Sequence, residues 1–219
     1  MTEEELEELL ENCPKLYHMA EHKSWPSISD RGLLSTVAIL DLYGVRGKKR
    51  IQIEEYRRAT SVVLKHSSLP PIVIRDQIPL SDSALKKCLL DGLEPRDWYR
   101  LLNSRVFFWP SEERLMRLLS ARAYRGKKHD ILEVDTKAIV RDFPDKITLS
   151  PINSGSTLFN PSPRGKQTFS RIKDFPYADR PKGNRVAELA IDHSVPNISD
   201  YVGRVVEMQG NKVIRVVKS

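Results

Sequence analysis

The order of helix and strand patterns is the feature of this sequence that most restricts its fold. Apolar residues at helical spacing dominate the first part of the chain, whereas short β-branched and aromatic runs dominate the second. A doubly wound sheet needs strands and helices in regular alternation, and the sequence lacks that order. We therefore expect an α+β fold, built as a single domain over residues 1–219.

Caps and turn residues mark the boundaries of the expected elements. Thr2 and Glu5 form a capping-box pattern for a helix over 3–12, within a helical N-terminal part of residues 1–15. Further helices are predicted from caps or apolar stripes over 24–32, 35–44, 52–65, 81–92, 111–126 and 136–143. Strands are predicted from apolar runs over 16–20, 72–80, 105–109, 130–135, 146–150 and 185–191, followed by a hairpin that turns at Gly210 and Asn211.

The expected cellular compartment follows from the lack of a membrane span or secretory signal in this sequence and from its two cysteines. The sequence has no apolar run near 20 residues, which argues against a membrane span, and its acidic beginning is unlike a secretory signal. Cys13 and Cys88 lie far apart in the sequence, so reduced thiols are expected. No His/Cys cluster has metal-ligand spacing. We expect a cytoplasmic protein without a metal.

The charge balance favours a polyanionic partner. The net charge is +7 and the isoelectric point about 9.4, which suits nucleic acid. Residues 152–184 combine Ser, Asn, Gly and Pro with several cations. A loop of this length is either functional or simply flexible. If it is functional, its cations and aromatic ring could hold a single strand, and the candidates are Arg164, Lys166, Phe169 and Arg171.

Two polar residues within apolar strands are candidates for chemistry. His18 lies in the strand over 16–20, either as a core histidine or as a polar group at a cleft edge. Glu188 alternates with Leu189, so it points to the opposite face from the core. It is either a solvated strand position or a carboxylate held in a cleft, where it could stabilise a cationic sugar.

An aromatic run forms a third candidate. Phe107, Phe108 and Trp109 end a strong strand, and at least one ring must face the core. A ring on the other face could stack on nicotinamide or on a base.

Two motifs resemble those of a known superfamily. The segment "LYHMAEHKSWPSISDRGLLS" is similar to the opening motif of ADP-ribosyltransferases, and "RVAELAIDHSVP" is similar to the strand that carries their catalytic glutamate. The resemblance is strongest to DarT-type DNA ADP-ribosyltransferase toxins, with a related likeness to tRNA 2′-phosphotransferases. It covers about a third of the chain and differs at Met19 and Ala20, where a hydroxyl is usual two positions after the histidine.

The resemblance implies a split β-sheet core with peripheral helices and an NAD-dependent mono-ADP-ribosyl transfer, with nucleic acid as the expected target. NAD would be the co-substrate. Glu188 would be catalytic, assisted by Arg57 or Arg58, although arginines on a surface helix are common. The NAD-binding residues would be His18, Ser35, Phe107, Phe108 and Trp109.

Two further functions remain open at this stage. One is a nucleotide- or nucleic-acid-binding module of the same fold without transfer activity, and the other is an RNA 2′-phosphotransferase-like enzyme. By analogy at the level of the fold alone, the protein could be a toxin or anti-phage effector, with an antitoxin as a neutralising partner.

Overall fold

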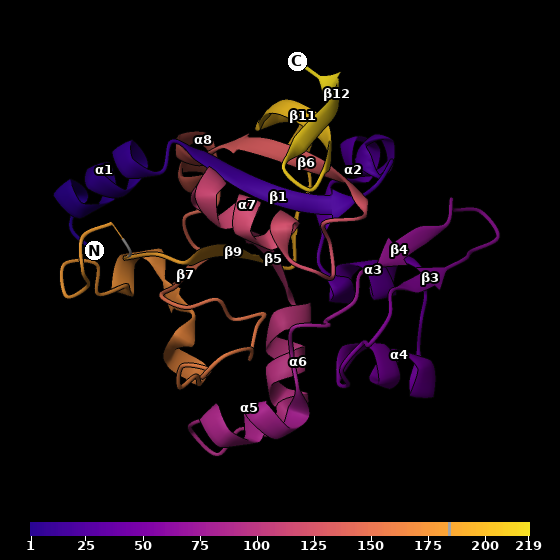
Figure 1. Ribbon diagram of the computed structural model, residues 1–219, viewed down its shortest axis with the longest axis horizontal. Coiled ribbons are helices and arrows are strands. Elements are labelled where there is room, and N and C mark those ends of the chain that lie inside the picture. Colours follow the sequence, from indigo (N-terminus) through magenta and orange to yellow (C-terminus); the bar gives the residue numbers. More distant parts are fainter. Residues whose placement is uncertain (184) are drawn as a thin grey trace.

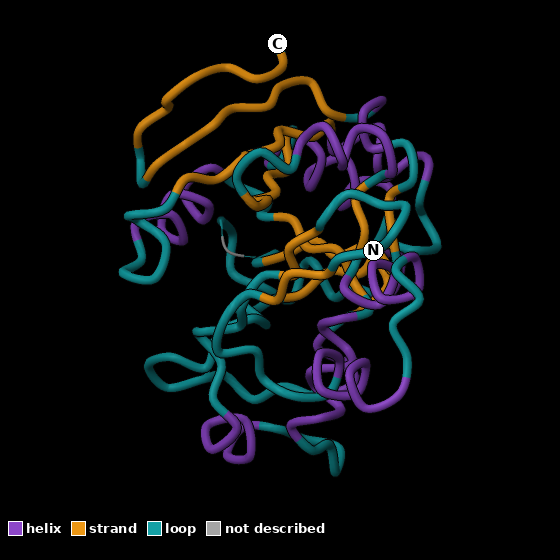
Figure 2. Tube along the Cα trace, turned by 90° about the vertical axis from the view of Figure 1, so that its right-hand side faces the viewer, coloured by secondary structure: helices purple, strands orange, loops and turns teal. Residues whose placement is uncertain are grey.

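The computed structural model describes residues 1–183 and 185–219, and it confirms the α+β class. Residue 184, the last position of the predicted loop 152–184, lies outside the described residues. The first of two four-stranded antiparallel sheets has the order β1 (Lys15–Glu21), β6 (Lys128–Asp135), β11 (Val202–Gln209) and β12 (Lys212–Lys218). Figure 2 shows the hairpin of β11 and β12 at the outer edge of the molecule.

The second sheet has the order β5 (Arg105–Phe108), β9 (Glu188–Asp192), β7 (Ile147–Ser150) and β8 (Ser170–Arg171), and is also antiparallel. The two sheets meet where Tyr17 and Trp109 form a β-bridge, in which their backbone groups exchange two hydrogen bonds of 2.9 Å. His18 follows Tyr17 and therefore lies next to the junction of the sheets.

The helices surround this pair of sheets (Figure 1). Their bounds are α1 Glu3–Asn12, α2 Trp25–Arg31, α3 Thr36–Leu42, α4 Gly47–Glu54, α5 Asp82–Cys88, α6 Pro95–Asn103, α7 Glu112–Ser120 and α8 Thr136–Asp142. Two small antiparallel pairs complete the fold, formed by β2 (Leu33–Leu34) with β10 (Ser194–Val195) and by β3 (Val62–Leu64) with β4 (Ile72–Ile74). Short 3₁₀ turns cover Lys166–Thr168, Ile172–Asp174 and Ile198–Asp200.

The main core joins the two sheets. Alternate residues of β9, such as Leu189 and Ile191, pack in one apolar cluster with Leu132 and Val134 of β6. A second cluster places Leu115 and Leu119 of α7 against the residues of β1, β6 and β11 that face away from the main core. α7 therefore covers part of the first sheet beside the junction.

Two satellite clusters build the part of the molecule drawn below and to the right of the sheets in Figure 1. One joins α5 and α6 to Phe169 of the long loop, through the buried Trp98. The other joins α3 and α4 to the β3–β4 pair. The first of these clusters also includes Phe107, so it covers part of the side of β5 that faces away from the main core.

Helix α1 contacts the segment that leads into β9. The expected capping box of Thr2 and Glu5 is present, and Glu5 also accepts a hydrogen bond of 3.1 Å from the Ala178 backbone. Farther along α1, Glu8 forms an ion pair of 2.8 Å with Arg185. The N-terminal helix thus holds the chain three residues before Glu188.

Most predicted boundaries agree with the structure, including the helix capped by Ser35, the helix capped by Ser111 and the final hairpin. The helix predicted over 52–65 is wrong, because the helix spans Gly47–Glu54 and the chain then continues to strand β3. The sequence reading also left α6 unassigned, although Pro95 stands in its first turn and Trp98, Tyr99 and Leu102 form its buried face.

Candidate functional site

A cavity of about 1040 Å³ opens at the junction of the two sheets. Its walls come from β1, the start of α3, the segment after β4, β5 with Trp109, α7 and the loop at 153–158. His18 and Glu188 both line this cavity, although they lie at opposite ends of the sequence. The structure thus brings together the two residues that the sequence singled out.

Glu188 begins strand β9 and is buried, with 4% of its surface exposed. The alternation along β9 places it on the opposite face from Leu189, as expected, but that face is covered and is not the solvated position considered above. Burial raises the pKa of Glu188 to about 7, although the hydrogen bond from the Ser154 backbone and the charges of Arg164 and Arg114 oppose the shift.

The backbone N–H of Ser154 donates a hydrogen bond of 3.0 Å to Oε2 of Glu188. Ser154 is held by its own carbonyl oxygen, which accepts bonds from Arg164 Nη1 at 3.1 Å and from Trp98 Nε1 at 3.2 Å. The same Arg164 nitrogen also donates to the Ser156 carbonyl at 3.0 Å. A buried guanidinium therefore fixes the short loop that orients the glutamate.

Arg114 on α7 also lines the cavity. Its half-buried guanidinium is one of the charges that lower the pKa of Glu188, and burial lowers its own pKa. The sequence reading did not identify this residue, because an arginine on an amphipathic helix resembles an ordinary surface residue.

The tautomer of His18 follows from its contact with β5. Its Nδ1 lies 2.8 Å from the Phe107 carbonyl oxygen, so Nδ1–H must donate, since the carbonyl can only accept. Burial, together with the nearby charge of Arg75, lowers the pKa of His18 to about 4, although the hydrogen bond to the Phe107 carbonyl opposes the shift. The imidazole is therefore neutral near pH 7, and its Nε2 is an acceptor at the cavity wall.

The aromatic run and Ser35 line the same cavity. Phe108 is buried in the main core and meets the His18 ring edge to face at 5.7 Å, whereas Phe107 and Trp109 are half-buried. Ser35 caps α3 by accepting a bond of 3.2 Å from the Ala38 backbone. Phe107 and Trp109 thus have ring surface at the cavity, while Ser35 already has a structural role.

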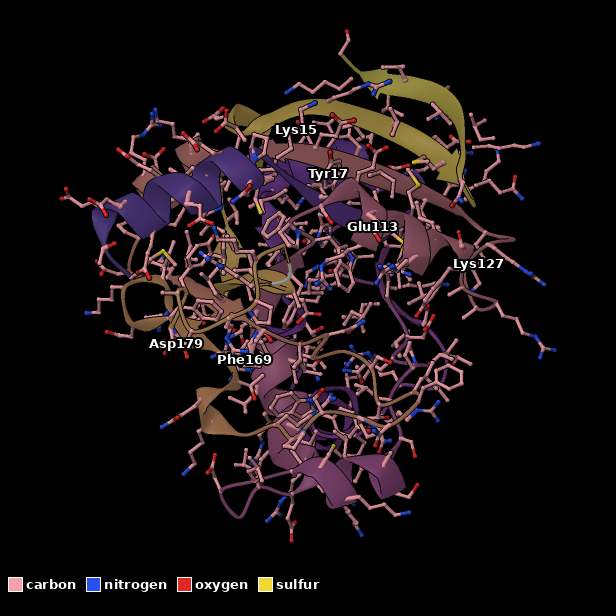
Figure 3. The ribbon with its side chains drawn as sticks, turned by 60° about the vertical axis from the view of Figure 1, so that its left-hand side comes forward. Lys15, Tyr17, Glu113, Lys127, Phe169 and Asp179 are labelled. Carbon is pink, nitrogen blue, oxygen red and sulfur yellow. The ribbon has the colours of Figure 1, made fainter. Side chains whose placement is uncertain are left out.

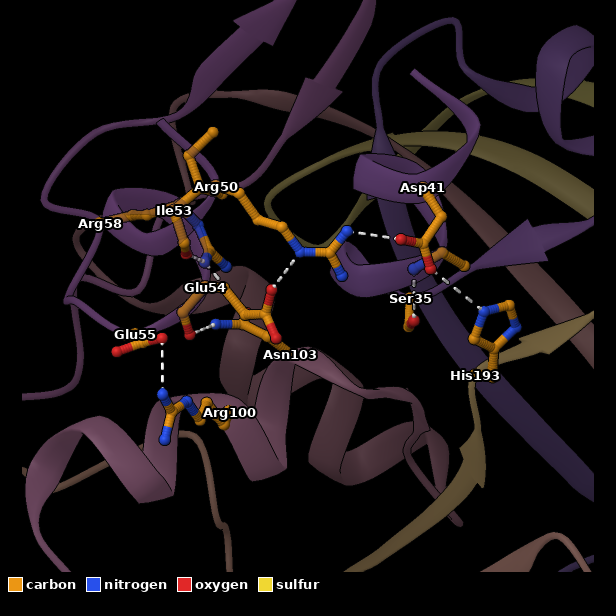
Figure 4. Close-up of polar contacts among 11 residues, drawn as sticks. Ser35, Asp41, Arg50, Ile53, Glu54, Glu55, Arg58, Arg100, Asn103 and His193 are labelled. Atoms are coloured by element: carbon orange, nitrogen blue, oxygen red, sulfur yellow. Dashed lines mark hydrogen bonds and ion pairs between the residues drawn. The ribbon is translucent and has the colours of Figure 1, made fainter. Parts of the chain in front are cut away.

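Arg57 and Arg58 do not line this cavity, in contrast to the catalytic role that the resemblance implied. Arg58 is buried, and its guanidinium donates to the carbonyls of Ile53 at 2.7 Å and Arg75 at 2.9 Å and to Asn103 at 3.0 Å (Figure 4). The exposed Arg57 donates to the Ile78 carbonyl at 3.0 Å. Arg58 is a structural brace between α4, α6 and the segment after β4.

The four residues predicted to bind a nucleic-acid strand have separate roles. Arg164 is buried near Glu188. Phe169, labelled in Figure 3, is also buried, and its ring stacks on that of Trp98 with centroids 5.7 Å apart. Neither presents a free surface to a strand, which corrects the expectation for these two residues. Lys166 is exposed, and Arg171 is half-buried with an ion pair of 2.6 Å to Asp192.

A family profile matches residues 14–202, and the chain belongs to that family, described as the family of unknown function DUF7002. No curated protein matches the chain. Across the part of the chain that the structure describes, no helix is both long and apolar enough to cross a membrane. Among those same residues, no group of three His, Cys, Asp or Glu side chains is arranged to hold a metal ion.

Proposed function

We propose that this protein is an NAD-dependent mono-ADP-ribosyltransferase with the split-sheet fold of that superfamily. The observation that carries the proposal is the buried carboxylate of Glu188 in the same cavity as the neutral His18. Two sheets that meet at a β-bridge are what a split sheet requires. The cavity of about 1040 Å³ is large enough for a dinucleotide, since ligand sites commonly enclose roughly 300–1,000 Å³.

Glu188 has the chemistry that the first half of the reaction needs. When the bond between nicotinamide and its ribose breaks, the bonding electrons leave with nicotinamide and positive charge develops on the sugar. An ionised carboxylate fixed beside that sugar stabilises the charge, and the Ser154 hydrogen bond keeps the carboxylate in one orientation.

His18 and the aromatic run would position the dinucleotide. The Nε2 acceptor of His18 suits a ribose hydroxyl, because the hydroxyl can donate to it. The half-buried rings of Phe107 and Trp109 offer stacking surface for nicotinamide. Arg114 of α7 lines the same cavity, and a guanidinium there suits a phosphate.

The test compares the wild type with Glu188→Gln, which keeps the shape of the side chain and removes its charge. We expect the wild type to bind NAD and release nicotinamide, and the variant to bind NAD but cleave it about 100-fold or more slowly. Glu11→Gln is the matched control, because Glu11 is exposed at the end of α1. A Glu188→Gln variant that releases nicotinamide at the wild-type rate would contradict the proposal.

The same measurement addresses the other functions considered for this fold. NAD binding without release of nicotinamide, by wild type and variant alike, would favour a nucleotide-binding module. Removal of a 2′-phosphate from an RNA end in the presence of NAD would favour the phosphotransferase-like reaction. Failure to bind NAD at millimolar concentration would exclude both NAD-dependent activities.

A further inference from the structure

The cavity holds a second buried carboxylate, from the segment that follows β4. Asp76 lines the cavity, and its side chain is only 3% exposed. The sequence reading predicted this segment as extended and assigned it no function. The segment is fixed in place by Arg58, whose carbonyl accepts a bond of 2.7 Å from Gln77 N and whose Nε donates to the Arg75 carbonyl.

The two oxygens of Asp76 have different surroundings. Oδ1 accepts hydrogen bonds from the Tyr124 phenol at 3.1 Å and from Ile78 N at 3.3 Å. Within the described residues, the partner recorded for Oδ2 is the Lys127 ammonium at 4.0 Å, which is too far for a hydrogen bond. Since a buried carboxylate oxygen is costly when it is left without a donor, Oδ2 has capacity for an N–H or O–H group of a ligand.

The cations around Asp76 indicate that this ligand is also an anion. Arg75 lines the cavity beside Asp76, and its guanidinium lies 5.1 Å from the centroid of the Tyr124 ring. Arg117 and Arg122 line the cavity as well and are exposed. Arginines at such positions suit phosphate groups, and a guanidinium plane also stacks on bases.

A nucleotide meets all these conditions at once. The base of a nucleotide supplies an N–H donor for Asp76, and its phosphates suit the exposed Arg117 and Arg122. Arg75 adds positive charge beside Asp76 while its guanidinium donates a hydrogen bond of 3.0 Å to the Met19 carbonyl. An acidic protein surface would supply anions for the arginines, but a carboxylate would be repelled by Asp76. A base can reach a cavity wall only when it is out of a double helix, so the strand would be single.

We propose that Asp76 binds the acceptor base of a single-stranded nucleic acid and takes its proton during transfer. This inference rests on the proposed function. The bond that forms joins the ribose carbon to a nitrogen of the base, and the bond that breaks is the one to nicotinamide, which keeps the electron pair. The N–H proton of the base passes to Oδ2 of Asp76 and then to water, so that charges and atoms balance.

The experiment uses the full chain and separates the two halves of the reaction. Release of nicotinamide with water as the acceptor reports NAD cleavage, and transfer of labelled ADP-ribose to mixed-sequence single-stranded DNA or RNA reports the acceptor step. Binding of the same oligonucleotides, followed by fluorescence anisotropy, does not depend on NAD. The variants are Asp76→Asn and Arg122→Ala, with Asp145→Asn and Arg96→Ala as controls, because both control residues are exposed and neither lines the cavity.

We expect Asp76→Asn to slow the transfer of ADP-ribose about 100-fold more than it slows NAD cleavage, as for loss of a general base. Arg122→Ala should weaken oligonucleotide binding and reduce its salt dependence by roughly one counterion. The control variants should match the wild type. Tyr124→Phe, which removes one donor to Asp76, should reduce transfer less than Asp76→Asn and tests the site should Asp76→Asn fold poorly.

Three results would overturn the inference. The first is transfer by Asp76→Asn at the wild-type rate. The second is transfer to acidic proteins by a wild type that leaves oligonucleotides unbound. The third is equal loss of NAD cleavage and transfer in Asp76→Asn, which would place Asp76 in the first half of the reaction. If the wild type binds oligonucleotides through Arg122 but never cleaves NAD, the proposed transferase function fails while the binding surface stands.

Discussion

Ser154 and Glu188 are joined by a hydrogen bond of 3.0 Å although 34 positions separate them in the sequence. The bond places the loop from 152 onward in contact with the candidate catalytic carboxylate. Arg164 stabilises that contact by donating to the carbonyl oxygens of Ser154 and Ser156. The main role that the structure gives this part of the loop is to orient Glu188 and set its charge state.

The first prediction concerns the dependence of NAD cleavage on pH. Glu188 must be ionised to stabilise a cationic sugar, and its pKa is about 7. We expect kcat/KM for nicotinamide release to rise with pH and level off above about pH 8, with a value at pH 5 about 100-fold below the plateau. A profile that stays flat between pH 5 and 8 would contradict the assignment.

The second prediction concerns stability. The pKa of Glu188 is higher in the folded chain than the ordinary value of 4.5, so ionisation of this group opposes folding. The cost is absent below about pH 4, grows as the pH rises to about 7, and reaches roughly 3 kcal/mol above that. Glu188→Gln should therefore be more stable than the wild type at pH 8 and similar near pH 4, as measured by urea unfolding. Equal stabilities at pH 8 would show that burial does not penalise this charge.

A third prediction follows from the position of Arg164. Arg164→Ala removes three hydrogen bonds to carbonyls and a cation near Glu188, so we expect a loss of about 3 kcal/mol in unfolding free energy. The remaining activity should show its pH midpoint above that of the wild type. Arg164→Lys keeps the charge, so its midpoint should lie closer to that of the wild type. Lys166→Ala is the control and should change stability by less than about 0.5 kcal/mol, since Lys166 is exposed.

The fourth prediction separates Arg58 from Arg57. Arg58→Met leaves Asn103 and two carbonyls without their donor and should lower the unfolding free energy by about 2–4 kcal/mol. Arg57→Ala should be neutral within about 0.5 kcal/mol. Nicotinamide release per folded molecule should remain within about threefold of the wild type in both variants. A specific loss of NAD cleavage in Arg57→Ala would restore the role that the resemblance implied.

Local patterns were sufficient for most elements of the fold. The capping box of α1, the Ser35 and Ser111 caps and the Gly210–Asn211 turn all depend on residues a few positions apart, and each is present. The helix predicted over 52–65 is wrong in its second half because Val62, Val63 and Leu64 form a strand that pairs with β4, a contact that spacing within the segment cannot reveal.

The site was predictable only where a polar residue interrupts an apolar strand. His18 and Glu188 gave that signal. Asp76 also interrupts a predicted strand, over 72–80, but it was not singled out there. Arg114 and Ser154 gave no signal, because an arginine on a helix or a serine in a loop has the same pattern whether it faces water or a cavity. Phe169 was wrongly predicted to bind a nucleic-acid strand. An aromatic ring among cations in a loop resembles a binding surface, but the Phe169 ring packs on Trp98.

The contacts between α1 and the segment before β9 restrict where the N-terminus of the chain can be truncated. The family match begins at residue 14, so a fragment cut at that boundary would lack α1. Such a fragment would lack Glu8, which pairs with Arg185, and Glu5, which accepts the hydrogen bond from the Ala178 backbone. The segment before the strand that carries Glu188 would then lose both contacts with α1. A fragment that starts at residue 14 would thus keep every residue that lines the cavity but lose the contacts that fix the chain just before Glu188.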